Sequence, residues 1–414
     1  MTAADRCPVC AGIEIEDTVE RRRLPAMQNY VHRTREAALE ATAGHLTLAL
    51  CHRCGFAWNR TFDPTLLAYD DGYDNAVPSA VMERYYREIA DHLRTTYELD
   101  GGLVVDVGCG NGAFLRMLCE AVPDLRGLGV DPALDREREE LGGRVRLVKD
   151  VFGAAVVAER PSLVVTRHVL EHMPDPVGFL RAIDEAVAPH GSCPCFFEIP
   201  ELTSIVRNEA FWDFCYEHCN YFTAASVREA LRRAGFGEIA TTPAYGGQYL
   251  WVEASAGADS APSSAGPDRE AIAMLPAYAA AEEAALASAT ALLRDFGTES
   301  REIAVWGMAT KGVLFSVLTD PDASLIDFCV DANTNKQGSF VPLTGHAISA
   351  PGALRSRLDD RPLVVVVMNE LYGAEIEAMC HALGVTATFV NASGQSTGGV
   401  SRIRSRSGTG SPGR

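Results

Sequence analysis

The sequence lacks any run of about 18 consecutive apolar residues, the length that a membrane-spanning helix needs. Its first residues, MTAADRCPVC, lack the apolar core of a secretory signal peptide. Excess positive charge is also missing, because 37 Lys and Arg against 55 Asp and Glu give a formal net charge of -18. These absences argue against a membrane protein, a secreted protein and a protein that binds the phosphate backbone of nucleic acid. They predict a cytoplasmic protein.

What is present is typical of a globular protein with more than one core. The 414 residues are 47% hydrophobic and 22% charged, which is enough for two or three domains. The 12 cysteines occur without a secretory signal, so they indicate metal ligation or buried thiols more than disulfides.

Four of the cysteines form two C-x-x-C pairs. They are Cys7 and Cys10, then Cys51 and Cys54, with 40 residues between the pairs. Two such pairs supply the four soft ligands of a closed tetrahedral zinc site, whereas thiol–disulfide redox chemistry is the alternative. Because four thiolates leave no open position on the ion, we expect zinc to stabilise the N-terminal segment and to take no part in chemistry.

A strand, a glycine turn, a helix and a second strand follow one another from Leu103 to Asp131. The first strand ends in Asp106, and the second ends 25 residues later in Asp131. The glycines of the turn are Gly108, Gly110 and Gly112. Glycines let the chain turn sharply beneath a ligand, and an acid after the second strand can accept two ribose hydroxyl groups. The pattern therefore predicts a nucleoside site.

The third glycine comes one residue earlier than in the dinucleotide-binding motif G-x-G-x-x-G. The sequence Asp-Val-Gly-Cys-Gly-Asn-Gly resembles instead the first motif of class I S-adenosylmethionine (SAM) methyltransferases. The resemblance implies that the glycines surround the methionine part of SAM, that Asp131 holds the ribose and that Asp150 meets the adenine. An NAD site, or a turn that only packs tightly, is the alternative.

Two clusters of polar residues follow later strands. The sequence at 170–172 is Leu-Glu-His, and in many class I methyltransferases a similar sequence borders the cofactor. We therefore expect His168, two residues before it, to lie beside SAM. The alternative is that His168 and His172 only close a turn. The second cluster lies in an aromatic segment and comprises Tyr216, Glu217, His218 and Tyr221. Such surroundings shift pKa values and can make a histidine a usable base, although a satisfied core histidine is equally compatible with the composition.

After the low-complexity residues 255–268 and an alanine-rich helix, a second strand, glycine turn and helix begin at Ile303. Further strands end at Asp331 and Met368, and this order predicts a second α/β domain. Residues that could contact a phosphate at its strand ends are Gly307, Lys311, Gly312, Asp331 and Lys336. The alternative is a domain without a ligand of its own.

Together, these parts resemble the three-domain SAM-dependent C-methyltransferases that act on nucleotide-linked 4-keto-deoxysugars in antibiotic biosynthesis. The resemblance extends from Cys7 to about Val390 and rests on the cysteine pairs, the SAM motif, the Glu217-His218 pair and the sequence DANTNKQG at 331–338. It implies SAM and structural zinc as cofactors and a nucleotide-linked sugar as small-molecule substrate. It also implies substrate contacts by Tyr73, Lys311 and Lys336.

The resemblance further implies that His218, helped by Glu217, is the general base. A carbon next to a ketone is a poor acid, so its deprotonation needs a placed base and donors that stabilise the enolate oxygen. Tyr216 or Tyr221 would donate to that oxygen, and the carbanion would attack the methyl group of SAM held in line with it.

The chain departs from that family on the expected substrate side. Cys215 stands where the sugar enzymes have a tyrosine two residues before the glutamate, and Gln248-Tyr249-Leu250 replaces their Ser-Leu-Arg. The SAM turn also has the generic Gly-Cys-Gly-Asn-Gly in place of Gly-x-Asn-Asp-Gly. Methyl transfer to oxygen, nitrogen or another carbon of a different small metabolite is therefore the alternative, and a SAM-binding scaffold is the non-enzymatic one.

We thus predict an α/β protein in which a class I methyltransferase Rossmann-like domain is flanked by a small zinc-binding domain and a second Rossmann-like domain. The predicted segments are a zinc-binding domain at 1–75, a methyltransferase domain at 76–254, a linker at 255–268, a Rossmann-like domain at 269–392 and a disordered tail at 393–414.

Overall fold

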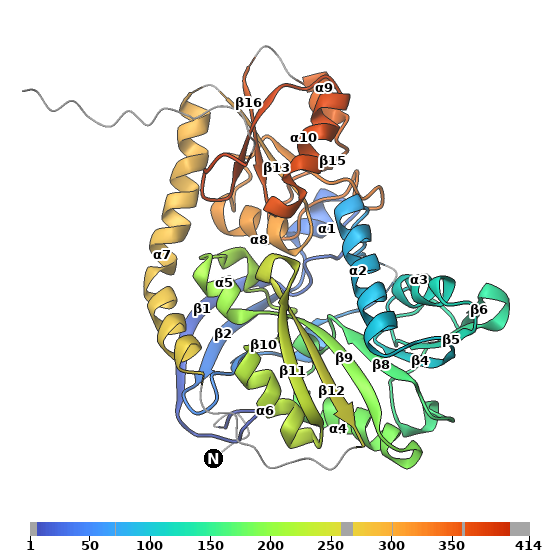
Figure 1. The fold of residues 1–414 in the computed structure, drawn as a ribbon. Coiled ribbons are helices and arrows are strands. Elements are labelled where there is room, and N and C mark those ends of the chain that lie inside the picture. The colour runs from blue at the N-terminus through green and yellow to red at the C-terminus, as the bar shows by residue number, and fades with distance from the viewer. Residues whose placement is uncertain (1–5, 71, 258–267, 300, 358–360, 398–414) are drawn as a thin grey trace, which may run out of the picture.

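The computed structural model describes residues 6–70, 72–257, 268–299, 301–357 and 361–397 (Figure 1). Every site residue predicted above lies within these ranges. Residues 258–267 of the predicted linker and residues 398–414 of the predicted tail lie outside them. None of the described helices is both long and apolar enough to cross a lipid bilayer.

The first sheet is antiparallel and contains strands from two distant parts of the chain. Its order is β1-β2-β3-β10. The strands are β1 (Ile15–Pro25), β2 (Ala43–Cys51), β3 (Ala57–Asn59) and β10 (Asn220–Tyr221). Because β10 directly follows Glu217 and His218 in the chain, the N-terminal sheet fixes the position of that pair.

The second sheet has the strand order β11-β12-β9-β8-β4-β5-β7-β6. Its strands are β4 (Gly102–Val107), β5 (Leu125–Val130), β6 (Arg138–Glu140), β7 (Val145–Val148), β8 (Leu163–Arg167), β9 (Cys193–Pro200), β11 (Gly237–Ala244) and β12 (Tyr249–Ala256). The neighbouring strands β9, β8, β4, β5 and β7 run parallel to one another. At one edge β6 pairs antiparallel with β7, and at the other edge β12 pairs antiparallel with β9 and with β11. The chain order reverses between β4 and β8, and ligands of such sheets bind at the strand carboxyl ends beside that point.

Helices cover both faces of this second sheet. They are α2 (Ala80–Thr96), α3 (Ala113–Ala121), α4 (Pro176–Val187) and α6 (Ala224–Ala234). Successive residues of β4 point to opposite faces: Val104 packs with α2 and α3, and Val105 packs with α4 and α6. Burial on both sides explains why β4 is apolar almost throughout.

The third sheet is entirely parallel, with the order β15-β14-β13-β16-β17. Its strands are β13 (Glu302–Trp306), β14 (Phe328–Val330), β15 (Ile348–Ser349), β16 (Leu363–Val367) and β17 (Ala387–Asn391), with helices α8 (Thr310–Thr319), α9 (Ala353–Arg357) and α10 (Gly373–Ala382). The expected α/β class, with a Rossmann-like sheet in the middle and another near the C-terminus, is confirmed.

The long helix α7 (Arg269–Thr298) runs from the C-terminal sheet down to the N-terminal one (Figure 1). Its Glu282 forms a buried ion pair with Arg21 of β1 and accepts a hydrogen bond from Tyr278 (2.7 Å). Arg21 also donates to the carbonyl oxygens of Phe211 (2.8 Å) and Phe214 (2.7 Å). The helix therefore supports the segment that leads to Glu217. Short elements near it are α1 (Arg35–Leu39), α5 (Leu202–Arg207), η2 (Pro64–Leu66), η5 (Leu170–His172) and η7 (Phe211–Asp213).

Candidate active site

The glycine turn after β4 has the geometry of a ligand-binding turn. Gly108, Gly110 and Gly112 have φ values of 74°, 54° and 76°, which L side chains rarely adopt. A Cβ at Gly108 would lie 2.3 Å from Val169, and one at Gly112 would lie 2.6 Å from Leu147. A Cβ at Gly110 would meet no atom of the described residues within 4 Å. Gly110 thus leaves its backbone open to a ligand, while the other two glycines allow close packing.

Of the three predicted acids, Asp131 bonds this turn, Asp106 lies within β4 and Asp150 follows β7. The Asp131 carboxylate accepts hydrogen bonds from the N–H groups of Gly110 (2.7 Å) and Ala133 (2.8 Å), which fixes it beside the turn. Asp150 is exposed, and its carboxylate accepts a bond from Val151 N–H (2.7 Å). Asp106 is buried, and this burial raises its pKa to about 7 against the lowering effect of Arg167.

His168 lies at the carboxyl end of β8 within a buried charge network. Its Nε2 is 3.2 Å from Glu198 and its Nδ1 is 3.4 Å from Glu171. Burial acts to lower the His168 pKa, but these carboxylates outweigh it and raise the pKa to about 9. Arg167 also donates to Glu198 (2.8 Å), and the His168 ring contacts Tyr249 edge-on. His168 is therefore a cation at neutral pH.

Glu217 and His218 lie opposite His172, a residue that the sequence left undecided. His172 Nδ1 donates to the Glu217 carbonyl oxygen (3.0 Å), so this nitrogen carries a proton. The His172 and His218 rings meet edge to face at 4.9 Å. One ring nitrogen each of His172 and His218 and one carboxylate oxygen of the buried Glu171 all lie within 4.8 Å of one another. Two imidazoles and the Glu171 carboxylate thus converge at one place, where His172 also contacts the main chain of Glu217.

The protonation states of this cluster suit proton transfer. Burial, with the neighbouring His172 adding to it, lowers the pKa of the half-buried His218 to about 3, so this imidazole is neutral at pH 7. Glu217 is 2% exposed; one of its oxygens accepts from Gln28 N–H (3.4 Å), and the other has no hydrogen-bond partner among the described residues. Buried groups without partners are rare, and they mark places where a ligand can supply the missing bond.

The phenols nearest Glu217 are not those that the sequence singled out. The Tyr216 hydroxyl accepts from the N–H of Asp63 (2.7 Å) and donates to its carbonyl oxygen (3.3 Å). The Tyr221 hydroxyl accepts from the N–H of Cys215 (3.0 Å) and donates to its carbonyl oxygen (2.8 Å). The structure therefore does not bring either hydroxyl to the expected enolate position, because main-chain groups already engage both of them.

Tyr69 and Tyr73 are the phenols that lie near Glu217. Their rings meet at 5.0 Å, and the Tyr69 hydroxyl is 3.4 Å from His172 Nδ1. Burial and the Glu217 charge raise the pKa of Tyr73, so its hydroxyl keeps its proton and can donate. Tyr73 was expected on the substrate side; Tyr69 and His172 were not assigned to a site. The only signals for them were the two tyrosines in one polar segment and the Leu-Glu-His motif.

The two predicted substrate lysines are held by protein groups. Lys311 forms an ion pair with Asp213 (2.5 Å). Lys336 is buried and donates to Asn29 Oδ1 (2.8 Å) and the Met308 carbonyl oxygen (3.0 Å). Gly307 follows β13 with a φ of 103°, and a Cβ there would meet no described atom within 4 Å. The open backbone at Gly307 is the feature of this edge best suited to a ligand.

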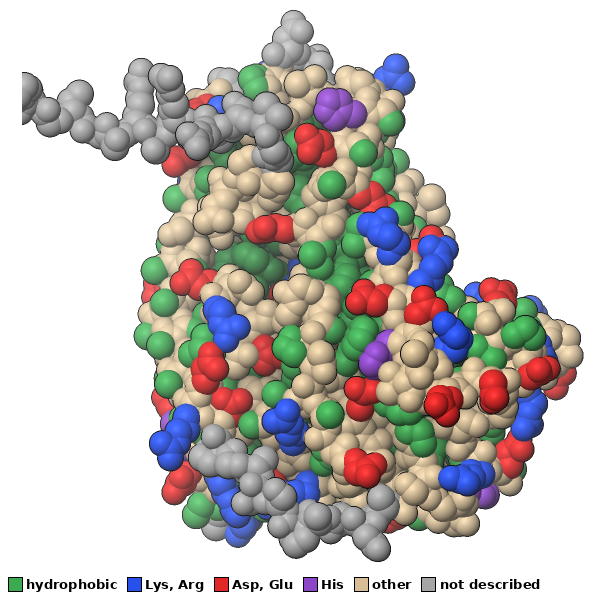
Figure 2. All heavy atoms as spheres, in the orientation of Figure 1, with side chains coloured by type: hydrophobic (Ala, Val, Ile, Leu, Met, Phe, Trp, Pro, Cys, Tyr) green, Lys and Arg blue, Asp and Glu red, His purple; other side chains and the backbone are tan. Residues whose placement is uncertain are grey.

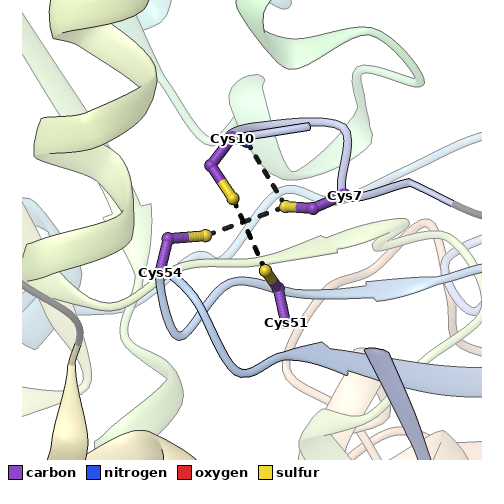
Figure 3. A group of neighbouring side chains, drawn as sticks. All are labelled: Cys7, Cys10, Cys51 and Cys54. Atoms are coloured by element: carbon purple, nitrogen blue, oxygen red, sulfur yellow. Dashed lines mark hydrogen bonds between the residues drawn. The ribbon is translucent and has the colours of Figure 1, made fainter. Parts of the chain in front are cut away.

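The four cysteines of the two pairs point at one another (Figure 3). Their sulfur atoms all lie within 4.8 Å of one another, with 3.7 Å from Cys7 to Cys54 and 3.5 Å from Cys10 to Cys51. All four are buried and none forms a disulfide. Main-chain N–H groups of Cys10 and Gly12 point at the sulfurs of Cys7 and Cys10 (3.4 Å each). This donor set fits a tetrahedral zinc ion.

Comparisons with known proteins agree with this arrangement. The family model described as a methyltransferase domain matches residues 81–240, and the model described as a C-methyltransferase C-terminal domain matches residues 268–389. C-methyltransferase NovU from Streptomyces niveus is 27% identical over 380 residues, which cover 87% of this chain and 89% of NovU. The ubiquinone biosynthesis O-methyltransferase from Ralstonia nicotianae is 31% identical over 108 residues, which cover 24% of this chain and 45% of that protein.

Among solved structures, the CurJ carbon methyltransferase is similar to this chain with 12% identity and a TM-score of 0.33, covering 44% of this chain and 56% of that one. The riboflavin-related dimethyltransferase RosA from Streptomyces davawensis has 22% identity and a TM-score of 0.33, covering 42% and 55%. The two domain matches and the similarity to NovU identify the chain as a SAM-dependent methyltransferase and support a C-methyltransferase family.

Proposed function

We propose that this methyltransferase transfers the methyl group of SAM to carbon on a nucleotide-activated 4-keto-deoxysugar, in natural-product biosynthesis, and that the reaction passes through an enolate. The observation that carries the proposal is the similarity to C-methyltransferase NovU, because it extends over 87% of the chain and includes the segments on both sides of the methyltransferase domain. We further propose that the protein is cytoplasmic.

The residues around Glu217 supply the groups that an enolate mechanism needs. Neutral His218 accepts the proton from the carbon next to the ketone. Tyr73, with Tyr69 beside it, donates a hydrogen bond to the enolate oxygen as negative charge develops there. The Glu217 carboxylate stabilises the imidazolium that forms on His218. SAM, when bound, supplies an electrophilic methyl group, and the positioning of carbon and methyl in line supplies much of the rate.

The proposed SAM site lies at the carboxyl ends of β4, β5, β7 and β8. The three glycines of the turn flank the methionine part, Asp131 binds the ribose hydroxyls and Asp150 lies toward the adenine. Asp106 lies in β4, the strand that leads into the turn, and the His168 cation lies beside the cofactor. Each Asp131 oxygen has a lone pair left after its bond to the main chain, so the carboxylate can still accept from ribose.

The remaining parts of the proposal concern zinc, the substrate and the division of the chain. Structural zinc would be bound by the four cysteines shown in Figure 3. Figure 2 shows hydrophobic side chains exposed between the C-terminal sheet and the β11–β12 pair. The nucleotide-linked sugar would contact Tyr73, Lys311 and Lys336. The division into units at 1–75, 76–254 and 269–392 stays a proposal.

The direct test incubates the enzyme with a panel of nucleotide-linked 4-keto-6-deoxysugars in deuterated water and follows them by mass spectrometry. We expect deuterium uptake next to the ketone in the absence of SAM, and a methyl mass gain when SAM is added. Measured SAM binding with neither exchange nor methylation would reject the sugar proposal. The second candidate, transfer to oxygen, is favoured by the O-methyltransferase relatives and predicts methyl gain without exchange.

The SAM site can be tested separately from the substrate. Asp131→Ala should weaken SAM binding about 10- to 100-fold, because hydrogen bonds to a charged acceptor contribute about 1.5–3 kcal/mol. Isothermal titration calorimetry with SAM measures the change. Asp135→Ala is the matched control, since Asp135 lies on the same loop but faces Arg138 (3.0 Å). Equal affinity of the Asp131 variant and the control would remove Asp131 from the site.

A further inference from the structure

Asp74 links the segment that carries Tyr73 to the loop after β14. Its Oδ1 accepts from Asn333 Nδ2 (3.0 Å), and its Oδ2 accepts from Asn335 Nδ2 (2.8 Å). These partners are 259 and 261 residues away in the chain. The Asp74 N–H also donates to the Asn29 carbonyl oxygen (3.0 Å). One carboxylate thus joins the N-terminal part of the chain to the C-terminal sheet.

The loop that receives Asp74 is itself held firmly. Asn333 is 5% exposed, and its N–H donates to Asp331 (2.7 Å). The N–H of Asn335 donates to the side chain of Asn333 (2.9 Å), while Arg33 donates to the Asn335 carbonyl oxygen (2.9 Å). Both amides therefore present their N–H groups from fixed positions, and a carboxylate that accepts from both has little freedom left.

The same contacts set the position of Tyr73, which precedes Asp74. Tyr73 forms an antiparallel bridge with Tyr30, and the Val31 N–H donates to the Gly72 carbonyl oxygen (2.8 Å). Gln28, at the start of this N-terminal stretch, donates from its N–H to Glu217 (3.4 Å). Bonds on both sides of Tyr73 therefore hold its ring toward Glu217, and the following residues 75–77 are exposed.

We infer that Asp74 is a positioning residue, which clamps the main chain beside Tyr73 to Asn333 and Asn335 and so keeps the Tyr73 hydroxyl at the Glu217–His218 site during methyl transfer. The inference rests on the proposed function for the role of Tyr73. Asp74 itself touches neither substrate nor cofactor; its effect passes through Tyr73.

Steady-state kinetics of Asp74→Ala test the inference. We expect kcat to fall about 10-fold, since misplacement of a donor by about 1 Å can cost up to about 100-fold, with unchanged SAM affinity. Asp74→Asn keeps an acceptor for Asn333 and should recover part of the rate. The matched control is Glu375→Ala, because Glu375 attaches the start of α2 to the same C-terminal unit through Ser79 (2.6 Å) but does not contact the main chain beside Tyr73.

A double-mutant comparison separates positioning from general destabilisation. If Asp74 acts through Tyr73, Asp74→Ala should add no further loss of kcat to Tyr73→Phe. Fully additive losses, or equal losses in Asp74→Ala and Glu375→Ala, would overturn the inference. Hydrogen exchange of the peptide around residues 66–78 provides a readout that does not need turnover. Faster exchange in Asp74→Ala than in Glu375→Ala supports the clamp, even if no keto-sugar is methylated. Equal exchange in the two variants rejects it.

Discussion

Replacing His218 by Ala should lower kcat about 100- to 10,000-fold and leave the dissociation constant of SAM unchanged. The reason is that a positioned general base contributes about that factor, whereas the residues proposed to bind SAM, the glycine turn and Asp131, are other parts of the chain. His218 is neutral at pH 7, because burial, with the neighbouring His172 adding to it, lowers its pKa to about 3. Rapid-quench kinetics on an accepted sugar give kcat, and calorimetry gives the SAM affinity. Deuterium exchange next to the ketone should disappear with the turnover.

The control for this experiment is His190→Ala, because His190 lies in the turn after α4, where its Nε2 is 3.2 Å from the Val157 carbonyl oxygen. It should keep wild-type kcat. If His218→Ala retains both turnover and exchange, another group removes the proton, and Glu217→Gln then shows whether that group is the neighbouring carboxylate. Loss of SAM binding in His218→Ala would instead indicate a disturbed fold.

Removing zinc should have the second large effect, on folding. We expect one zinc ion per chain in the purified protein, and its loss in the Cys7→Ser, Cys51→Ser double variant. Zinc binding to zinc-finger peptides contributes about 10–16 kcal/mol, which is as large as the total stability of a typical domain, about 5–15 kcal/mol. The N-terminal sheet should therefore unfold, which lowers soluble yield and Tm. Metal analysis by mass spectrometry and thermal unfolding measure the two effects.

Loss of zinc should also abolish turnover, although the cysteines bind no substrate. β3 begins three residues after Cys54, and it pairs with β10 through Asn220 and Trp58. The control Cys380→Ser changes a buried cysteine of α10 and should keep its zinc. A well-folded wild type without metal, or a double variant with full metal content, would disprove the zinc proposal.

The sequence was sufficient where a site is built from neighbouring residues. The SAM turn and its acids follow strands whose apolar runs are plain in the sequence, and the cysteine pairs have a spacing typical of zinc sites. Parallel strands then bring Asp131 and Gly110 within 2.7 Å, because the carboxyl ends of β4 and β5 are adjacent.

The sequence was insufficient where contacts join distant parts of the chain. Nothing local shows that the Tyr216 hydroxyl bonds Asp63, 153 residues away, or that His172 meets Glu217 across 45 residues. Tyr216 or Tyr221 was therefore expected to donate to the enolate, whereas the phenols that the fold places near Glu217 are those of Tyr69 and Tyr73. Likewise the charge of Lys311 is visible in the sequence, but its pairing with Asp213 is not.

The pairing of β10 with β3 bears on how such enzymes can be recombined. An exchange of whole units between relatives, cut at the borders of the methyltransferase region, would transfer β10 and leave behind the strand to which it bonds. The strand that positions Glu217 and His218 would then pair with a β3 from the other parent protein. Chimeras that exchange residues 6–67 together with the segment around 211–223 take β3 and β10 from the same parent. These two stretches should therefore be exchanged together, although they are far apart in the sequence.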